Sequence, residues 1–467
     1  MARIHIIGAG GDGMSALALL YLERGHAVTG SDLAANDKTE LLAARGARIA
    51  TGHDAALAAG AALVVHSPAI PRGNPELAAA RAAGTPVVNR TRALTTLLDG
   101  RSVVAVAGSH GKTTSTAMLA AILRAAGHAP GHMAGGTTPS LGAGAAWGDG
   151  PLFVAEACEA FRALDAWQPA HLLLTNVDDE HSDHYGALEA LRSAFADLAD
   201  RVPAGGALVL SGDDPFLAAL AAERGGRAIP FGLGAENAVM ATDVALAAGG
   251  STFTVTRDGA PVARVTLGVP GRHNVRNALG AFAMALALGV PAETAAATLA
   301  GYRSVGRRWQ LRGEERGVRV YEDFAHHPTE IAATLETARL AAGGGRVAAI
   351  VQPQLASRVG RLADAYAAAL DAADRVYVLP LDPGGEAGDP AAAEAALARA
   401  LAARGVATMP VTADADDAAA IASSLAEGDV AVAMGPSGAP RLARMVTARL
   451  GAAPAVPAEP VGGTPAA

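Results

Sequence analysis

The sequence predicts an α/β protein with three domains. The chain has 467 residues, and a domain averages about 150 residues. Short apolar runs alternate with helical stretches along most of the chain, which favours parallel sheets covered by helices on both faces. Hydrophobic residues make up 51% of the chain and charged residues 18%. A chain of this composition can bury a large core.

The apolar runs divide the chain into three segments. We expect the first domain at residues 1–98, where "RIHIIGAG", "AVTGSD", "ALVVHSPAI" and "TPVVN" are predicted strands. The second, residues 99–311, contains "SVVAV", "LFVAEA", "HLLLTNV" and "GALVLSG", and its residues 251–269 form a predicted β-hairpin that turns at "RDGA". The third, residues 312–451, has four strands from "VRVYEDF" to "DVAVAMG". Residues 452–467 are rich in Pro, Ala and Gly, and we predict that they are disordered.

The composition excludes several classes of function. The formal net charge is −8 and there is no dense run of Lys or Arg, so we expect no nucleic-acid partner. The single cysteine, Cys158, fits a reducing cytoplasm, and the N-terminus lacks a signal-peptide pattern. The longest apolar candidate, residues 278–290, is shorter than the roughly 18 residues that span a bilayer. We therefore expect a cytoplasmic protein without a membrane span.

A glycine-rich turn follows the first predicted strand. Gly8, Gly10 and Gly13 fit the G-x-G-x-x-G pattern, and Asp32 ends the second predicted strand. Glycines let the backbone approach a diphosphate, and the helix N-terminus supplies N–H donors. The pattern alone suggests NAD, although a UDP-sugar fits equally well. A tight turn without a ligand remains the structural alternative.

The segment "GSHGKTT" (108–114) predicts a phosphate-binding loop. It lies between an apolar strand and a helix, and it departs from the usual pattern at Val106, where a glycine is common. Lys112 would neutralise the β and γ phosphates of a nucleotide, and the Thr113 hydroxyl would ligate Mg²⁺. The alternative is a surface turn.

Two acidic segments follow strands of the same domain. Glu156 lies in "EACEAF", and His181 lies in "TNVDDEHSDHY" (175–185). Since each follows an apolar strand, both side chains can reach the sheet edge that carries the phosphate-binding loop. Carboxylate and imidazole suit a divalent ion, Mg²⁺ or Mn²⁺. The alternative is a solvated acidic loop.

Three further segments carry candidate polar residues. "GRHNVRNALGA" (271–281) opens a helix and offers Asn side chains that suit an adenine edge, although Asn274 could simply cap the helix. "GRRWQ" (306–310) contains an arginine pair suited to a transferring phosphoryl group. In "YEDFAHHPTE" (321–330), two carboxylates and then two adjacent histidines follow a strand.

Together these segments resemble the Mur ligases of peptidoglycan synthesis, over residues 3–445 and in the same order. The matched segments are "GAGGDGMS", "GSHGKTT" for "GTHGKTT", "TNVDDEHSDHY" for "TNIDADHLDHY", "GRHNVRNA" for "GRHNxxNA", "SVGRRW" for "GVRRRF" and "EDFAHHPTE" for "DDYxHHPTE". The "GKTT" and "HHPTE" matches are the most specific. The resemblance implies a Rossmann-like UDP-sugar domain, a central P-loop ATPase-type domain and a Rossmann-like C-terminal domain that brings the amino acid.

The resemblance also implies ATP as cofactor, with Mg²⁺ or Mn²⁺, and it assigns site residues. The implied nucleotide-binding residues are Gly108, Ser109, His110, Gly111, Lys112, Thr113, Thr114, His273, Asn274, Asn277 and Asp323. The implied metal ligands are Thr113, Glu156 and His181. The implied substrate-binding residues are Gly10, Gly11, Gly13, Met14, Ser15, Asp32, Ser67 and Arg358. The implied catalytic residues are Lys112, Arg307, Arg308 and His327.

The chain departs from the family pattern where the family binds the amino acid and the sugar acid. "EACEAF" stands for "EADESD", "QPQLASR" (352–358) for "QPHRYTR", and "MGPSGAP" for a terminal "GAGD". The single positions that differ are Cys158, Phe161, Phe324, Gln354, Leu355, Ala356 and Asp382. Leucine cannot hold a carboxylate as an arginine fork does, which leaves Arg358 for that role. We therefore predict that L-alanine is a poor acceptor.

The default function that the resemblance implies is ATP-dependent ligation of UDP-N-acetylmuramate to L-alanine through an acyl phosphate. A diverged Mur-type ligase would use another amine or acid in a specialised pathway, and the family also contains a tripeptide-recycling ligase. An NAD-dependent oxidoreductase would leave "GSHGKTT" and "HHPTE" without a role, and a binding protein would not turn over ATP. The expected partners are a UDP-linked sugar acid and an amino acid or amine, and we expect a monomer or homodimer.

Overall fold

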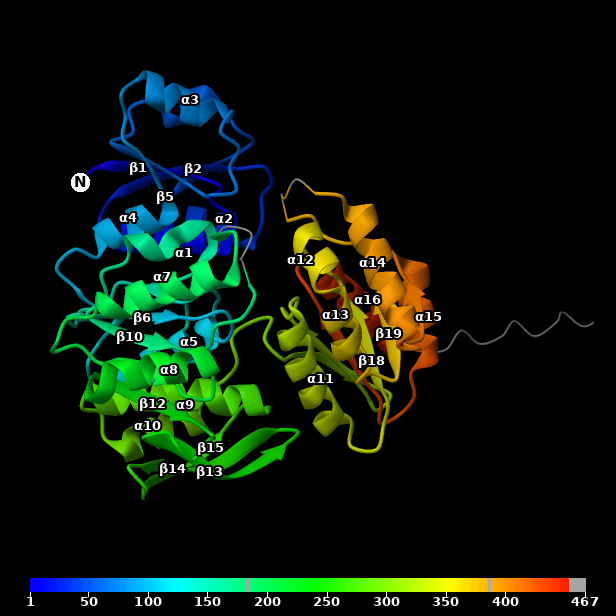
Figure 1. Ribbon diagram of the computed structural model, residues 1–467. Helices are drawn as coiled ribbons and strands as arrows, with labels where there is room; N and C mark the ends of the chain where they lie inside the picture. The colour runs from blue at the N-terminus through cyan, green and yellow to red at the C-terminus, as the bar shows by residue number, and fades with distance from the viewer. Residues whose placement is uncertain (181–184, 385, 387, 453–467) are drawn as a thin grey trace, which may run out of the picture. The chain divides into compact units, whose positions relative to one another are not determined.

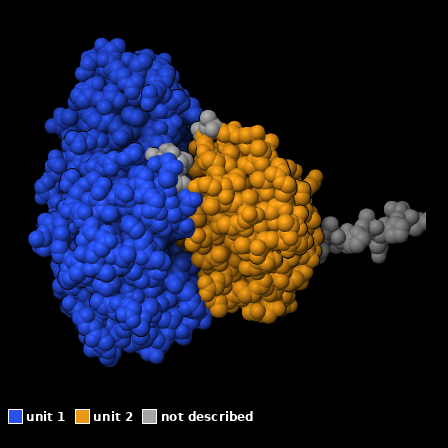
Figure 2. Space-filling view, viewed as in Figure 1, with its two compact units in different colours: residues 1–306 blue, residues 307–467 orange. Residues whose placement is uncertain are grey.

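The computed structural model describes residues 1–180, 185–384, 386 and 388–452. These residues form three sheets with helices between their strands, and the strand pairs are mostly parallel, so the predicted α/β class is confirmed. The chain divides into two compact units, Met1–Gly306 and Arg307–Ala467, which Figure 2 colours separately. The first unit contains two of the sheets and the second unit contains one.

The first sheet has five parallel strands in the order β3-β2-β1-β4-β5. Their bounds are β1 (Arg3–Ile7), β2 (Ala27–Asp32), β3 (Arg48–Thr51), β4 (Leu63–His66) and β5 (Val87–Asn89). The central strand β1 consists of "RIHII" and is almost entirely buried. The glycine-rich turn follows β1 and so lies at the carboxyl ends of the strands, at the point where the strand order changes direction and open α/β sheets bind ligands.

Helices cover both faces of this first sheet (Figure 1). They are α1 (Asp12–Glu23), α2 (Asp37–Ala44), α3 (Pro75–Ala82), α4 (Arg90–Leu97) and the short 3-10 helix η1 (Ala55–Ala58). Leu77 and Ala80 of α3 pack with Ile7 and Val64 in a small cluster on one face. On the other face, side chains of α1 and α4 join a large cluster that continues into the second sheet.

The second sheet has ten strands in the order β15-β14-β13-β12-β11-β10-β6-β9-β7-β8. Their bounds are β6 (Ser102–Ala107), β7 (Gly131–Met133), β8 (Ala145–Ala146), β9 (Leu152–Glu156), β10 (His171–Leu174), β11 (Leu208–Ser211), β12 (Ala228–Gly232), β13 (Val239–Ala247), β14 (Gly250–Arg257) and β15 (Ala260–Leu267). Strands β14 and β15 pair antiparallel, which confirms the predicted hairpin. Strands β6, β9 and β10 are adjacent and parallel, so the loops that follow them meet at one edge.

The helices of the second sheet are α5 (Lys112–Ala125), α7 (Leu188–Asp200), α8 (Pro215–Arg224), α9 (Arg272–Ala287) and α10 (Ala292–Ala300), with the 3-10 helices η2 (Ala160–Ala166) and η3 (Gly225–Arg227). The Ala-rich segment 278–290 supplies most of α9, whose residues from Ala278 to Ala285 are all buried. Helix α5 packs against α9 beside the phosphate-binding segment.

Trp147 joins the first two sheets within the first unit. Its ring lies between two guanidinium groups, with Arg24 4.7 Å and Arg101 4.8 Å from the ring centroid. The Trp147 backbone N–H donates to Glu23 Oε2 at 2.6 Å, and Arg101 also donates to the Leu152 carbonyl at 2.9 Å. Cation–π contacts of this kind add to the shared apolar cluster and tie the end of α1 to the central sheet.

The second unit contains a six-stranded sheet in the order β16-β17-β21-β18-β19-β20. The strands are β16 (Gln310–Glu315), β17 (Val318–Asp323), β18 (Val347–Val351), β19 (Arg375–Val378), β20 (Thr408–Pro410) and β21 (Val430–Met434), and only the pair β16–β17 is antiparallel. The helices are α11 (Pro328–Ala342), α12 (Ala356–Arg361), α13 (Ala363–Leu370), α14 (Pro390–Ala403), α15 (Ala415–Ser424) and α16 (Gly438–Gly451). Separate apolar clusters lie on the two faces of the sheet.

The proposed boundary between residues 311 and 312 falls inside β16, and the second compact unit begins at Arg307. The division at residues 98 and 99 remains our proposal. Of the tail predicted to be disordered, residues 453–467 lie outside the described residues. None of the helices in the described ranges has the length and apolar character that crossing a membrane requires.

Candidate active site

The phosphate-binding segment forms a tight loop between β6 and α5. Gly108 has φ +122° and Gly111 has φ +80°, and both values lie in the left-handed region that favours glycine. A Cβ atom on Gly108 would come within 2.3 Å of Thr175 Oγ1, and one on Gly111 within 2.2 Å of Asn277 Oδ1. The close approach of neighbouring side chains therefore requires both glycines, and the loop leads into the start of α5, where helix N–H groups suit an anion.

Lys112, the first residue of α5, folds back over this loop. Its Nζ donates to the carbonyls of Gly108 at 2.6 Å and Ser109 at 2.8 Å, and it lies 2.9 Å from Glu159 Oε2. The Glu159 side chain is fully buried. Burial lowers the pKa of Lys112, but the neighbouring acidic groups, Glu159 first among them, together outweigh burial and hold the pKa above its usual value. The ammonium group is therefore charged and aimed at the loop.

Two predicted metal ligands lie in direct contact. Thr113 Oγ1 donates to Glu156 Oε2 at 2.7 Å, and the Gly135 backbone N–H donates to the same oxygen at 2.9 Å. A Cβ on Gly135 would come within 2.7 Å of both side-chain oxygens. Since β6 and β9 are parallel neighbours, their loops bring this hydroxyl and carboxylate together. The third predicted ligand, His181, lies outside the described residues.

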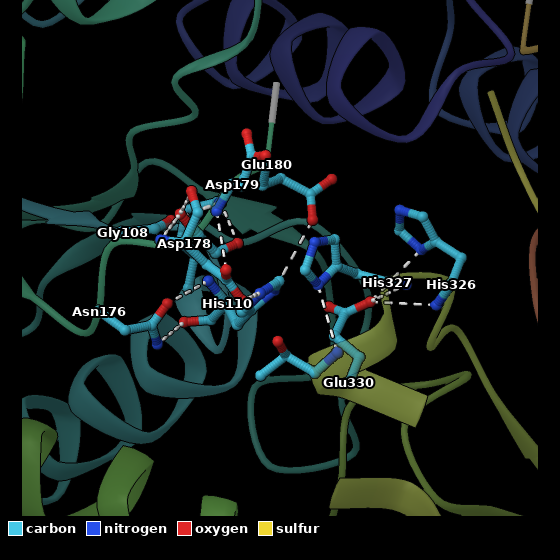
Figure 3. A network of polar contacts seen from close by, with 12 residues as sticks. Gly108, His110, Asn176, Asp178, Asp179, Glu180, His326, His327 and Glu330 are labelled. Atoms are coloured by element: carbon cyan, nitrogen blue, oxygen red, sulfur yellow. Dashed lines mark hydrogen bonds and ion pairs between the residues drawn. The ribbon is translucent and has the colours of Figure 1, made fainter. Parts of the chain in front are cut away.

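The segment that follows β10 is bonded to the phosphate-binding loop (Figure 3). Thr175 Oγ1 donates to the His110 carbonyl at 2.6 Å, and Asn176 Oδ1 accepts from the His110 N–H at 2.8 Å. His110 Nε2 lies 2.9 Å from Asp178 Oδ2, and the Asp178 N–H donates to Ser109 Oγ at 2.9 Å. These contacts on Ser109 and His110 hold the loop conformation from the side of β10.

The asparagines of "GRHNVRNALGA" lie at the start of α9. The Asn277 amide contacts Gly111, and Asn277 Nδ2 donates to Asn274 Oδ1 at 3.4 Å. Asn274 Nδ2 donates to the Pro270 carbonyl at 2.7 Å, and both side chains are buried. His273 is half-buried at the first turn. The structure thus brings the predicted adenine-binding segment against the phosphate-binding loop.

The glycine-rich turn of the first domain is held by the end of β2. Asp32 Oδ2 accepts from the Gly10 N–H at 2.8 Å, and Asn36 Nδ2 donates to the Gly10 carbonyl at 3.2 Å. Ser67, which follows β4, lies against Gly8, where an added Cβ would come within 3.3 Å of the Ser67 Cβ. Gly10, Asp32 and Ser67 therefore gather at one edge of the first sheet.

The other predicted residues of this turn form the start of α1. Gly11 is the residue before the helix, and Met14 and Ser15 are buried in its first turns. Gly13 lies under Arg90, because an added Cβ would come within 2.0 Å of Arg90 Nη1. We did not predict Arg90. The signal was available, since Arg90 directly follows β5 and side chains after parallel strands gather at the same edge.

Arg307 begins the second unit and is anchored there. Its Nε lies 3.2 Å from Glu322 Oε1, and its Nη2 donates to the carbonyls of Gly435 and Pro436. Arg312 also pairs with Glu322, whose side chain is 1% exposed. A buried carboxylate thus contacts two guanidinium groups, and Arg307 in addition binds the loop after β21.

Arg308 follows Arg307, and both guanidinium groups lie over the Phe324 ring. The Arg308 guanidinium is 5.2 Å from the Phe324 ring centroid and 3.8 Å from Glu330 Oε1. Asp323 accepts from the Trp309 N–H at 2.7 Å and the Ala325 N–H at 2.8 Å. Burial raises the pKa of Asp323, partly opposed by the charge of Arg308. Asp323 therefore fixes the backbone beside Arg308.

The paired histidines open α11. His327 is 2% exposed and caps the helix, since its Nδ1 accepts from the Thr329 N–H at 3.3 Å. The His326 N–H donates to Glu330 Oε2 at 3.1 Å, as Figure 3 also shows. Arg358, the predicted carboxylate ligand, lies in α12 and is 2% exposed. In the second unit, Asp323 thus holds the end of β17 and His327 holds the start of α11.

The departures from the family pattern near Glu156 change local charge and shape. Burial raises the pKa of the Cys158 thiol to about 11, so this position is neutral at pH 7. Phe161 has φ +58° and a 54% exposed side chain. Glu159 lies just before the turn at Phe161 and three residues after β9, which places it beside the start of α5. Two carboxylates thus lie at and just after the end of β9. Glu156 contacts Thr113, and Glu159 contacts Lys112.

The fold and the site define a nucleotide-phosphate-binding α/β enzyme with a separate glycine-rich domain. Residues 3–102 match "Mur ligase family, catalytic domain", residues 106–285 match "Mur ligase middle domain", and residues 307–437 match "Mur ligase, glutamate ligase domain". The chain belongs to the Mur ligase family. The resemblance drawn from the motifs and the prediction of a ligase are thereby confirmed, and the oxidoreductase alternative is set aside.

Relatives of the whole chain support this assignment. The chain is 44% identical to a UDP-N-acetylmuramate–L-alanine ligase of Renibacterium salmoninarum over 83% of both chains. It is 41% identical to the enzyme of that name from Paenarthrobacter aurescens, over 93% of this chain and 94% of the relative. The UDP-N-acetylmuramate-alanine ligase of Thermotoga maritima superposes with a TM-score of 0.80 at 27% identity, covering 96% of this chain and 99% of that one. A murein peptide ligase of Psychrobacter arcticus gives 0.74 at 28% identity, covering 98% and 100%.

We expect Glu159→Gln to lower the kcat of phosphate release about tenfold. Lys112 loses an ionic partner, and one hydrogen bond to a charged group is worth about 1.5 kcal/mol. Steady-state phosphate release measures the effect. Asp165→Asn removes an exposed carboxylate six residues away and should match the parent. Equal kcat for Glu159→Gln and the parent would show that Glu159 does not orient Lys112.

We expect Glu322→Gln to lower the free energy of unfolding of the second unit by about 3 kcal/mol. Arg307 and Arg312 would keep their charges without the buried carboxylate, and breaking such a pair costs about 3–5 kcal/mol. Urea unfolding measures the change. Glu314→Gln alters an exposed carboxylate of β16 and serves as the control. An unchanged urea midpoint would contradict this account of Glu322.

Proposed function

We propose that the chain is an ATP-dependent ligase that joins UDP-N-acetylmuramate to L-alanine through an acyl phosphate. The observation that carries the proposal is the arrangement around α5, where Lys112 covers a phosphate-binding loop and Thr113 contacts Glu156. The relatives that carry this activity in their names are similar along most of the chain. A ligase of this kind must hold a nucleoside triphosphate beside a carboxylic acid.

The residues of the loop fit a magnesium nucleotide. The Thr113 hydroxyl and the Glu156 carboxylate, with 2.7 Å between their oxygens, are hard oxygen donors of the kind that Mg²⁺ prefers. When bound, the ion would neutralise phosphate charge. The N–H groups at the start of α5 would bind phosphate oxygens, and Lys112 would offset the charge that develops between the β and γ phosphates.

The reaction has two group transfers. A carboxylate oxygen of the sugar acid attacks the γ-phosphorus, the bond to the bridging oxygen breaks, and ADP leaves. The amine of the amino acid then attacks the carbonyl carbon of the acyl phosphate, and inorganic phosphate leaves as the amine loses a proton. The protein's task is to align these groups and to stabilise negative charge on the transferring phosphoryl group.

The first domain is proposed to hold the UDP-sugar. Its diphosphate would rest on the Gly10–Gly13 backbone at the start of α1, and the Arg90 guanidinium lies against Gly13. Arginine suits a diphosphate because its planar donors bind phosphate oxygens in pairs. Displacement of UDP-N-acetylmuramate by UMP, with no displacement by NAD, supports this assignment.

The second candidate is a related ligase that uses another amine. The observation that favours it lies at the start of α12, where "QPQLASR" lacks the histidine, arginine and tyrosine of the family pattern. Leu355 there has φ +65°, and its N–H donates to the Asp382 carbonyl at 3.0 Å, which fixes the loop that leads to Arg358. The sequence-based prediction that L-alanine is a poor acceptor belongs to this second candidate and competes with the first.

We expect phosphate release from ATP that depends on both UDP-N-acetylmuramate and an amine. Comparing kcat/KM for L-alanine, glycine, L-serine, larger amino acids and simple amines separates the two candidates. Efficient and selective use of L-alanine supports the first candidate and contradicts the prediction of a poor acceptor. Preference for another amine supports the second candidate, and no release with any amine contradicts both.

A further inference from the structure

A group of polar side chains lies inside the first domain, close to the glycine-rich turn. Its members are His5 of β1, Ser31 of β2, His53 after β3 and Glu76 at the start of α3. His5, Ser31 and Glu76 are 0% exposed, and the His53 side chain is 14% exposed. None of the motifs in the sequence pointed to this group, and the proposed reaction does not use it.

All of these side chains converge on the Glu76 carboxylate. His5 Nε2 lies 2.5 Å from Oε2, and His53 Nδ1 lies 2.7 Å from Oε1. Ser31 Oγ donates to the two oxygens at 2.8 and 2.9 Å. Burial raises the pKa of Glu76, but the hydrogen bonds from His5, Ser31 and His53 outweigh it and hold the pKa below its usual value. The Glu76 carboxylate is therefore ionised and hydrogen-bonded to all three neighbouring side chains.

The network is continuous with the backbone of the glycine-rich turn. The Ser31 carbonyl accepts from the N–H groups of Gly8 at 2.8 Å and Ala9 at 3.0 Å. The next residue, Asp32, accepts from the Gly10 N–H at 2.8 Å. The end of β2 therefore holds three consecutive residues of the turn, and Glu76 holds the Ser31 side chain at that strand end.

Attaching a helix to a sheet through a buried carboxylate carries a large desolvation penalty. Apolar side chains of similar volume often give equal or greater stability than a buried charged network. Such a network does fix one arrangement of its members, because each partner left without a hydrogen bond costs free energy. The network includes Ser31, whose carbonyl binds the glycine-rich turn. Its fixed arrangement can therefore also hold that turn in place.

We propose that Glu76 is a positioning residue for the glycine-rich turn and, through it, for the nucleotide-sugar diphosphate. The identity of that ligand rests on the proposed function. The positioning role itself concerns Gly8 and Ala9 and can be measured without a ligand.

The first measurement is amide hydrogen exchange of the ligand-free protein. In Glu76→Gln, we expect the Gly8 and Ala9 amides to exchange about tenfold faster than in the parent, while the amides of α2 keep their rates. Ser31→Ala removes only the hydroxyl and should accelerate exchange of the same two amides to a smaller extent. This variant provides the test if Glu76→Gln does not fold. Uniform acceleration across the domain, or none at Gly8 and Ala9, overturns the proposal.

The second measurement is the affinity for UDP-N-acetylmuramate by calorimetry. We expect Glu76→Gln to raise the dissociation constant about tenfold and to leave the KM for ATP unchanged. Asp54→Ala removes an exposed cap beside His53 and should match the parent in both measurements. Unchanged affinity in Glu76→Gln overturns the role in ligand binding. A parent protein that does not bind UDP-N-acetylmuramate contradicts the proposed function, and the exchange rates still decide the role of Glu76.

Discussion

Replacing Lys112 by alanine is expected to lower kcat/KM for ATP-dependent ligation by about 10²–10³, with the fold retained. The ammonium group contacts the carbonyls of Gly108 and Ser109, so it lies on the loop that would carry the phosphates. Removing it leaves the negative charge that develops between the β and γ phosphates without its nearest cation. Steady-state phosphate release with UDP-N-acetylmuramate and L-alanine measures the loss.

The chain offers a matched control because it contains only two lysines, Lys38 and Lys112. The Lys38 ammonium lies 2.7 Å from Asp12 Oδ1 at the surface, with 41% of its side chain exposed. At saturating UDP-N-acetylmuramate, Lys38→Ala should therefore keep the parent's turnover. Circular dichroism of both variants checks that they are folded. Turnover of Lys112→Ala close to that of the parent would remove the basis for the phosphate-binding role.

Glu156→Gln is expected to raise the Mg²⁺ concentration needed for half-maximal activity about 10–100-fold. The amide has the shape of the carboxylate but no charge, and carboxylate oxygen is the natural ligand of a hard cation. Thr113 would keep a hydrogen-bond partner in the variant, so the loop should stay folded. Titrating activity with Mg²⁺, and separately with Mn²⁺, measures the change.

His181→Ala tests the other predicted ligand and should also reduce turnover and raise the metal requirement. Glu189→Gln is the control for both variants, because its carboxylate is 78% exposed on α7. If Glu156→Gln and His181→Ala titrate with metal as the parent does, the two residues do not hold the ion.

The elements around the phosphate-binding loop could be predicted because their signals are local. An apolar run, a glycine turn and a helical run occur within residues 102–125, and β6 and α5 lie there. The contact between Thr113 and Glu156 follows from two predicted parallel strands whose loops share an edge. Strands β7 and β8 have three and two residues, which is too short for a periodic pattern.

The partners of buried charges could not be predicted in the same way. Glu159 and its partner Lys112 lie 47 residues apart in the sequence and meet just beyond the ends of the neighbouring strands β9 and β6. His5 stands in an apolar strand, and its partner Glu76 is 71 residues away in the sequence. No local pattern signals either pairing. Each depends on the packing of distant elements, which a single sequence does not display.

The Trp147 contacts bear on how the protein unfolds. Arg24, which follows α1 in the first domain, and Arg101, which precedes β6 of the second, both contact this ring. One apolar cluster also contains side chains of both domains. Because the first and second domains share this core, unfolding of one domain would expose apolar surface of the other. We therefore expect these two domains to unfold cooperatively. The unit that begins at Arg307 has its own clusters. We therefore expect two thermal transitions, although the described residues form three sheets.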